Sequence, residues 1–245
     1  MSFAGKTAVV TGAGGGMGFQ IASTLMAADA KVFGIDLKDR PAGFDGASYR
    51  QGDITDDGFV AGAMIAAAER SGRLDYLVNA AGVLLFGEDR SLVDVDLEVW
   101  DRVIRINLTG SMLTTRHAVP LMRQSGGGAM VHFSSIQCLR GDDRPQDAYQ
   151  VAKAGVIALS KSIAVQFAKD GIRSNVILPG GTDSPMQARW AGDPELKTRI
   201  AAGVPLGRVG TIEDMANACL FLLSDQAAFI TGTELIVDGG RMALP

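Results

Sequence analysis

The sequence predicts a single α/β domain in which a parallel β-sheet carries helices on both faces. Short runs rich in Val and Ile alternate with longer stretches of helical periodicity, and this βαβα order is typical of a parallel sheet. Several of the short runs are apolar on both sides, as expected of strands buried on two faces. The chain of 245 residues contains no linker, repeat or shift in composition, so one domain over 1–245 is the economical interpretation.

Seven runs are expected to form strands, the third being the weakest. In chain order they are residues 7–11, 31–36, 48–51, 74–79, 129–135, 174–178 and 234–237. Helical periodicity is clearest in residues 211–223, where apolar side chains recur at helical spacing. Thr211 and Asp214 fit a capping box at the start of that stretch. A second helix is expected over residues 148–169.

The composition indicates a compact chain with no electrostatic attraction for nucleic acid. Gly and Pro contribute 31 and 8 of the 245 residues, which is below the roughly 25–30% that marks low-complexity sequence. The net charge is −4 and like charges form no long blocks, so no nucleic-acid partner is expected. No apolar run approaches the roughly 18 residues of a membrane span, and no signal peptide is recognisable. Cys138 and Cys219 have no metal or disulfide spacing, so we expect a cytoplasmic protein with free thiols, no metal and no membrane contact.

A glycine-rich loop follows the first expected strand and precedes a helical stretch. Its residues, 11–18, have the spacing T-G-x-x-x-G-x-G, whereas Met17 occupies the last glycine of the commoner G-x-G-x-x-G pattern. Backbone N–H groups at a helix N-terminus attract anions, and residues without side chains let a pyrophosphate approach closely. The loop is therefore predicted to bind a dinucleotide, with a flexible turn as the weaker alternative.

An acidic residue ends the next expected strand. Asp36 lies 18 residues after Gly18, and an acid about 20 residues downstream can accept hydrogen bonds from both ribose hydroxyls and would repel a 2′-phosphate. No basic residue lies within the loop, although Lys38 and Arg40 follow Asp36. We therefore predict NAD as the cofactor, with NADP less favoured.

Tyr149 and Lys153 open the expected helix over 148–169, and residues at i and i+4 share one helix face. A phenol titrates near 10. A lysine cation beside it favours the phenolate and lowers that pKa, so that the tyrosine can exchange a proton with a carbinol or carbonyl oxygen. The pair by itself also occurs by chance, as an exposed tyrosine beside a solvated lysine.

Together the motifs resemble the short-chain dehydrogenase/reductase superfamily, in its branch of about 250 residues. They are the glycine loop of 11–18, Asn79-Ala80-Ala81-Gly82, Ser134-Ser135 and Tyr149-x-x-x-Lys153, in the family's order over essentially the whole chain. The resemblance implies a Rossmann-like, doubly wound sheet of seven parallel strands and a nicotinamide cofactor. It also implies a homotetramer, or in some members a dimer, that transfers hydride reversibly between a secondary alcohol and NAD.

The resemblance also implies roles for individual residues. Tyr149 would be the acid/base, Lys153 would bond the nicotinamide ribose and tune Tyr149, and Asn107 would join a proton relay through water. Successive strand residues face opposite sides, so only one of Ser134 and Ser135 can hold the substrate oxygen, and analogy favours Ser135. From Ser135 to Tyr149 is 14 positions, one more than is common in the family. Besides Tyr149 and Lys153, the residues expected to contact the cofactor are Gly12, Gly14, Gly15, Gly16, Met17, Gly18, Asp36, Leu37, Asp53, Ile54, Asn79, Ala80, Ala81, Gly82, Pro179, Gly180, Thr182 and Ser184.

The substrate is expected to be a small polar alcohol or ketone. Residues 184–204 should cover the pocket, and basic or amide side chains near its rim favour a sugar, a polyol or a hydroxy acid. The substrate contacts we expect are Gln137, Arg144, Met186 and Trp190, with Arg140 nearby.

Three other functions remain open from the sequence. A reductase of 3-oxoacyl thioesters on an acyl carrier protein is the main alternative. A non-catalytic cofactor-binding sensor is disfavoured because Tyr149 and Lys153 are both present. Sugar-nucleotide epimerases and dehydratases are disfavoured because they usually have a different glycine spacing and a larger C-terminal region.

Overall fold

The computed structural model describes residues 1–142, 144–190 and 192–245, and within them seven parallel strands form one sheet. The strands lie in the order β3-β2-β1-β4-β5-β6-β7, so the expected Rossmann-like, doubly wound sheet is confirmed, the weak third strand included. Their bounds are β1 Thr7–Thr11, β2 Lys31–Asp36, β3 Tyr49–Gln51, β4 Tyr76–Asn79, β5 Gly128–Phe133, β6 Ile172–Pro179 and β7 Glu234–Val237. The end of β5 differs from the expectation, because the strand stops at Phe133 and Ser134 and Ser135 lie beyond it.

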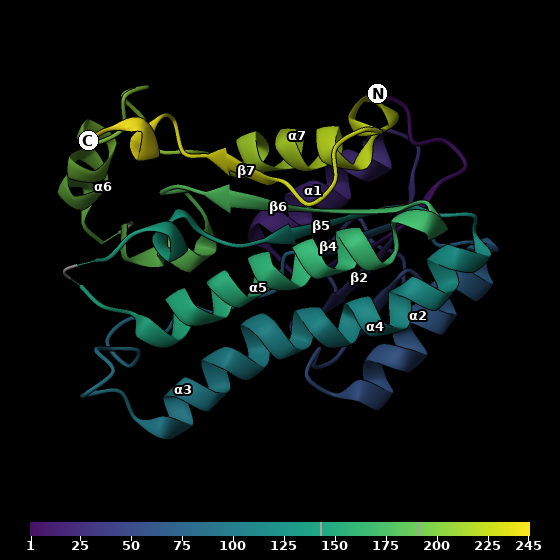
Figure 1. The fold of residues 1–245 in the computed structure, drawn as a ribbon, viewed down its shortest axis with the longest axis horizontal. Coiled ribbons are helices and arrows are strands. Elements are labelled where there is room, and N and C mark those ends of the chain that lie inside the picture. Colours follow the sequence, from purple (N-terminus) through teal and green to yellow (C-terminus); the bar gives the residue numbers. More distant parts are fainter. Residues whose placement is uncertain (143, 191) are drawn as a thin grey trace.

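Helices cover both faces of the sheet (Figure 1). They are α1 Gly16–Ala27, α2 Asp57–Ser71, α3 Leu97–Ile104, α4 Gly110–Gln124, α5 Asp147–Gln166, α6 Pro194–Ala202 and α7 Ile212–Leu223. A π-helical turn, Arg105–Thr109, joins α3 to α4. Helices α1 and α7 lie on one face, and α2, α4 and α5 on the other (Figure 1). In the part of the chain that the structure describes, no helix has the length and apolar character needed to span a bilayer.

Two apolar cores, one on each face, hold these layers together. Ile21 and Leu25 of α1 and Leu220 of α7 are buried against the first face of the sheet. Met64 of α2 and Met122 of α4 are buried against the opposite face. Since both faces are covered, the strands are apolar on both sides, as the sequence predicts.

The strand order places the functional motifs together. From β1 the chain proceeds outward to β2 and β3, and it then returns to the other side of β1 to form β4. Ligands of such sheets bind at the carboxyl ends of the strands, where the order reverses. Because every strand is parallel, the loops after β1, β2, β4, β5 and β6 all emerge at this edge.

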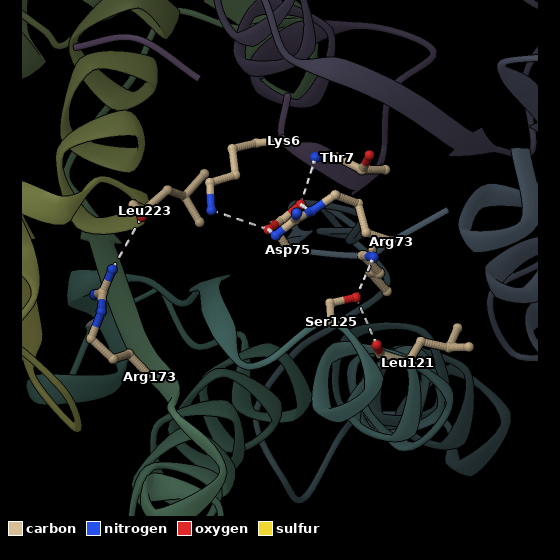
Figure 2. Close-up of polar contacts among 9 residues, drawn as sticks. Lys6, Thr7, Arg73, Asp75, Leu121, Ser125, Arg173 and Leu223 are labelled. Carbon is tan, nitrogen blue, oxygen red and sulfur yellow. Dashed lines mark hydrogen bonds and ion pairs between the residues drawn. The ribbon is translucent and has the colours of Figure 1, made fainter. Parts of the chain in front are cut away.

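Helix α7 shows how local sequence and a distant residue stabilise one element. The predicted capping box is present, since the Thr211 hydroxyl accepts from the N–H of Asp214 and the Asp214 carboxylate accepts from that of Thr211. At the other end, Arg173 of β6 donates to the carbonyls of Leu222, Leu223, Ser224 and Ile230. Figure 2 shows the bond to Leu223. The arginine thereby satisfies carbonyl groups that a helix C-terminus leaves unpaired.

Asp75 organises the opposite, amino-terminal end of the sheet (Figure 2). The carboxylate accepts from the Thr7 N–H at 2.9 Å and from the Arg73 Nε at 2.7 Å, and Lys6 Nζ lies 3.4 Å away. Burial opposes ionisation of Asp75, but the Arg73 hydrogen bond, the Thr7 N–H and Lys6 together hold its pKa below the ordinary carboxyl value. The charged group thus links the first residue of β1 to the residue before β4.

Replacing Asp75 by Asn should destabilise the protein in a pH-dependent way. We expect Asp75→Asn to lower the free energy of unfolding at pH 7 by about 1–3 kcal/mol, because buried donors lose a charged acceptor. A carboxyl with a lowered folded-state pKa stabilises above its unfolded pKa, about 3.9, and this stabilisation is lost as pH falls through the folded value. Urea unfolding should therefore show the difference between wild type and variant shrinking below about pH 4. The control is Asp45→Asn, which removes an exposed ion-pair partner of Arg70. An equal loss of unfolding free energy in both variants would contradict the stabilising role of Asp75.

Candidate active site

Two cavities meet at the carboxyl edge of the sheet. The smaller, about 450 Å³, extends along the glycine loop, and the larger, about 790 Å³, contains Ser135, Tyr149 and Lys153 in its wall. The residues that line both are Met17, Ala80, Gly82, Leu84, Ser184 and Met186. The shared wall makes the two cavities one continuous groove and chamber.

The glycine loop presents an uncapped helix N-terminus to the smaller cavity. Helix α1 begins at Gly16, and neither a side-chain cap at Gly15 nor an acidic residue in the first turn occupies its N–H groups. A Cβ on Gly12, whose φ is +73°, would lie 2.9 Å from the Ala81 nitrogen, and one on Gly18 would lie 2.2 Å from the Gly12 oxygen. Only glycine permits both approaches. The loop therefore fits a pyrophosphate, which needs free N–H groups and no side chain in between.

Asp36 closes the far end of this cavity. One carboxylate oxygen accepts from the Gly14 N–H and the other from the Lys38 N–H, each at 2.9 Å. A Cβ on Gly14 would lie 2.7 Å from the Asp36 Cγ, so this glycine lets the acid bind the loop. Leu37, Asp53 and Ile54, which the sequence predicts to contact the cofactor, line the same cavity.

The structure brings most of the expected cofactor residues into the groove and chamber. Those in the walls of the smaller cavity are Gly12, Gly15, Gly16, Met17, Gly18, Asp36, Leu37, Asp53, Ile54, Ala80, Ala81, Gly82 and Ser184. Tyr149, Lys153, Pro179, Gly180 and Thr182 line the larger one. Gly14 lies behind the wall and acts through its bond to Asp36.

Asn79 lies away from both cavities. Its Oδ1 accepts from the Thr114 hydroxyl at 2.7 Å, and its Nδ2 lies 3.1 Å from Nδ1 of His132. Burial lowers the pKa of His132 to about 4, so the imidazole is neutral in this network. The Asn79 side chain thus anchors the end of β4 beneath the loop that follows it.

Tyr149 and Lys153 are both buried, and burial dominates their pKa values. Lys153 Nζ lies 5.6 Å from the centre of the Tyr149 ring and donates to the Phe133 carbonyl at 2.9 Å. Burial raises the pKa of Tyr149 to about 12, although the nearby Ser135 side chain lowers it. Burial lowers the pKa of Lys153 to about 8. The expected lowering of the phenol pKa by Lys153 is therefore not found: Ser135 is the group that lowers this pKa, and burial, which disfavours the charged form of each group, dominates.

The two serines after β5 have different partners. The Ser134 hydroxyl donates to the Lys153 carbonyl at 2.8 Å and so attaches β5 to α5. Ser135 precedes the short helix Ile136–Leu139 and accepts from the Gln137 N–H at 3.2 Å. Its side chain is also close enough to Tyr149 to lower the pKa of the phenol. The geometry therefore places Ser135, the residue favoured by analogy, at the tyrosine.

Asn107 lies fully buried in the π-helical turn between α3 and α4. Its Oδ1 accepts from the Val83 N–H at 3.2 Å, and its Nδ2 donates to the Val83 carbonyl at 3.0 Å. A Cβ on Gly82 would lie 2.6 Å from that Oδ1 and 3.2 Å from Lys153 Nζ. Asn107 thus holds the loop after β4 against Lys153 with its side chain.

Sequence reasoning missed Asp89, a buried carboxylate in the wall of the larger cavity. It accepts from the Ala148 N–H at 3.1 Å and from the Tyr149 N–H at 2.9 Å, so it caps the first turn of α5. Burial raises its pKa even though both N–H bonds oppose this. No periodicity or motif marks Asp89 in the sequence, because its contacts lie about 60 residues away along the chain.

The expected substrate residues Gln137, Arg144, Met186 and Trp190 all line the larger cavity, as does Arg140. The segment 184–204 forms one wall through the turn Pro185–Trp190 and through Leu196 and Ile200 of α6. The Gln137 Nε2 donates to the side-chain Oε1 of Gln146 at 3.2 Å. The buried indole N–H of Trp190 has no acceptor among the described residues.

Within the same described part of the chain, no three His, Cys, Asp or Glu side chains cluster as metal ligands.

Comparison with known proteins gives consistent similarities over nearly the whole chain. Residues 12–241 match a family model described as enoyl-(acyl carrier protein) reductase. The chain is 37% identical over 248 residues to 2-(S)-hydroxypropyl-CoM dehydrogenase 3 of Xanthobacter autotrophicus, covering 96% of each chain. It is 39% identical over 253 residues to cis-4-hydroxycyclohexanecarboxylate dehydrogenase of Sinomonas cyclohexanicum, covering 99% of each. Among solved structures, the ligand-free aldohexose dehydrogenase of Thermoplasma acidophilum matches with a TM-score of 0.91 and 29% identity, over 99% of this chain and 96% of that one.

The contacts of Asp89 generate a prediction about helix α5. In Asp89→Asn, the side-chain NH₂ would face the N–H of either Ala148 or Tyr149, and that N–H would lose its acceptor. The free energy of unfolding should therefore fall by about 1–3 kcal/mol. Amide hydrogen exchange at Ala148 and Tyr149 should become faster by about tenfold or more, because the first turn of α5 loses its cap. Asp94→Asn, an exposed acid in the same cavity wall, should leave both quantities unchanged. Unaltered exchange at Tyr149 in Asp89→Asn would refute the capping role.

Proposed function

The chain belongs to the short-chain dehydrogenase/reductase superfamily, and we propose that it catalyses reversible hydride transfer between a secondary alcohol and NAD, with Tyr149 as acid/base. One observation carries the proposal. In a chamber that continues into the glycine-loop groove, Ser135 lies close enough to Tyr149 to lower the pKa of its phenol, and Lys153 lies beside its ring. A phenol, a hydroxyl and a cation at one cavity wall are the groups that proton exchange with an alcohol requires.

The nicotinamide, when bound, accepts or supplies the hydride. In alcohol oxidation, Tyr149 takes the proton of the substrate hydroxyl while the Ser135 hydroxyl holds the substrate oxygen. In carbonyl reduction, Tyr149 returns that proton, and its raised pKa favours the protonated form that this direction needs. Lys153 supplies a buried positive charge beside the phenol and, by the family resemblance, a donor for the nicotinamide ribose. Asn107 keeps the Gly82 backbone next to that ammonium group.

The residues of the smaller cavity support NAD as the cofactor. The N–H groups at the start of α1 would bind the pyrophosphate, and Asp53 and Ile54 would contact the adenine. Asp36 would accept hydrogen bonds from the ribose hydroxyls, and its negative charge would repel the 2′-phosphate of NADP. Lys38 lines the same end of the cavity, so the balance between the two cofactors rests on Asp36.

A polar alcohol such as a sugar, a polyol or a hydroxy acid is the substrate class that the larger cavity favours. Gln137, Arg144, Met186 and Trp190 would contact it. One relative is named for a hydroxycyclohexanecarboxylate, which supports a hydroxy acid. The matching family model is described by an acyl carrier protein substrate, so reduction of a 3-oxoacyl thioester is the second candidate. A panel of hydroxy acids, polyols and 3-oxoacyl thioesters, followed at 340 nm, distinguishes these functions.

A homotetramer is expected for the assembled enzyme. Exposed apolar side chains support an assembly, namely Val165 of α5, Phe229 and, on the edge strand β7, Ile236. Light scattering of the purified protein measures the number of subunits directly.

Removing the phenol hydroxyl tests the catalytic assignment. We expect Tyr149→Phe to lower kcat by about 10²–10⁴-fold or more, because the proton acceptor is lost. NADH binding should change by less than about threefold, since the ring and its packing remain. Tyr76→Phe, a buried tyrosine at the amino-terminal end of the sheet, is the matched control. Near-normal turnover in Tyr149→Phe would refute the role of Tyr149 as acid/base.

A second substitution tests the cofactor preference. Asp36→Ala should lower the ratio of kcat/KM for NAD to that for NADP by about tenfold or more, because ribose hydroxyls lose an acceptor and the 2′-phosphate loses a repelling charge. Asp39→Ala, an exposed acid three residues further on, should leave this ratio unchanged. An unaltered ratio in Asp36→Ala would show that another group selects the cofactor.

A further inference from the structure

The larger cavity has an excess of positive charge that proton exchange at Tyr149 does not use. Its acidic lining residues are Asp89, Asp94 and Asp142, and its basic ones other than Lys153 are Arg90, Arg140, Arg144, Arg189 and Arg241. Both oxygens of Asp89 are engaged by backbone N–H groups. Arg90 and Arg241 donate to backbone carbonyls, of Gly87 and Gly203. Two arginines, Arg144 and Arg189, stand out among the rest because they are close enough to affect each other.

Arg189, an exposed residue of the turn Pro185–Trp190, is oriented by two contacts at the cavity wall. Its guanidinium lies over the Phe86 ring, 3.9 Å from the ring centre, and its Nε donates to the Gln187 side chain at 3.0 Å. Its two terminal nitrogens have no hydrogen-bond partner within the described ranges. Stacking and one hydrogen bond thus orient the planar fork while leaving the edge that binds oxyanions unused.

Arg144 places a second positive charge beside the first. Burial, and after it the charge of Arg144, lowers the pKa of Arg189. No carboxylate of a described residue lies within 4.0 Å of either guanidinium, whereas Arg199, Arg208 and Arg123 all have acidic partners. Neither guanidinium is thus ion-paired within the described ranges, although the Asp142 carboxylate accepts from the Arg144 backbone N–H at 3.0 Å. The two neighbouring cations repel each other, and an anion between them would reverse this repulsion.

We propose that Arg189 and Arg144 form an oxyanion-binding subsite of the catalytic cavity, so that the substrate is a secondary alcohol that also carries a carboxylate, sulfonate or phosphate group. The inference rests on the proposed function only in placing the hydroxyl end of the substrate at Tyr149 and Ser135. Arg189 supplies the oriented bidentate contact, and Arg144, on the exposed rim, adds charge and attracts the anion from solvent. A neutral sugar or polyol would leave the two cations uncompensated.

Matched alcohols test the subsite through turnover. The set is a series of linear and cyclic secondary alcohols that differ only in one terminal group, a carboxylate, a sulfonate, a phosphate monoester or the neutral carboxamide. Wild type should prefer the charged members, and their rank order identifies which oxyanion is bound. Arg189→Met and Arg144→Met should each lower kcat/KM for the preferred anion by about 10- to 100-fold and for the carboxamide by less than about threefold. Arg199→Met, an exposed residue of α6 outside the cavity, should change neither.

Equal losses on the anion and the carboxamide would overturn the subsite, as would a wild-type preference for the carboxamide. Arg189→Lys keeps a positive charge but not the fork, so a loss intermediate between wild type and Arg189→Met supports bidentate binding. If Arg189→Met proves unstable by thermal unfolding, Arg144→Met on the exposed rim decides the question.

Binding without turnover separates this inference from the proposed function. Titration calorimetry with hexanoate and hexanesulfonate, which carry no hydroxyl group, should show salt-sensitive binding to wild type that Arg189→Met and Arg144→Met lose. If these probes bind in this way but no alcohol is oxidised, the subsite stands and the proposed reaction fails. If alcohols are oxidised but neither arginine affects probe binding, the subsite is refuted and the reaction stands.

Discussion

Gly12 and Ala81 hold the loops after β1 and β4 in backbone contact, and the geometry of the site depends on this approach. A side chain at Gly12 would come within 2.9 Å of the Ala81 nitrogen, while the Thr11 hydroxyl accepts from the Ala81 N–H at 3.2 Å. The next residue, Gly82, is pressed against Asn107, which in turn is held by the backbone of Val83. Lys153 lies at the end of this series of close approaches. A displacement at the glycine loop would therefore be transmitted to the lysine beside Tyr149.

Burial is the second influence on the chemistry of the site. Burial away from water raises the pKa of Tyr149 to about 12 and lowers that of Lys153 to about 8, so the neutral form of each group is favoured. Burial also lowers the pKa of Arg189 in the substrate chamber, and no arginine of that chamber has an ion-pair partner among the described residues. The chamber thus combines a buried proton-exchange site with a positively charged wall.

The two ends of the sheet have separate tasks. At the amino-terminal end, Asp75 and Arg173 satisfy backbone N–H and carbonyl groups with charged side chains that already have their partners. At the carboxyl end, N–H groups of α1 and the fork of Arg189 remain available. Charged groups at the amino-terminal end thus stabilise the fold through partners within the chain, whereas the N–H groups of α1 and the terminal nitrogens of Arg189 face the groove and chamber.

Patterns that are local in the chain were enough to predict the strands, the capping box of α7, the glycine loop and the Tyr149–Lys153 pair, because each depends on neighbours within one element or one turn. The parallel order then placed their loops at one edge. Contacts between distant segments decided the rest. Packing against α5 separated Ser134 from Ser135 and made Asp89 the cap of the tyrosine's helix. The side chains of His132 on β5 and Thr114 on α4 fixed the orientation of Asn79. The stacking of Arg189 on Phe86 and the direction of the Tyr149 pKa shift depend on which atoms exclude water, and only the folded chain determines this.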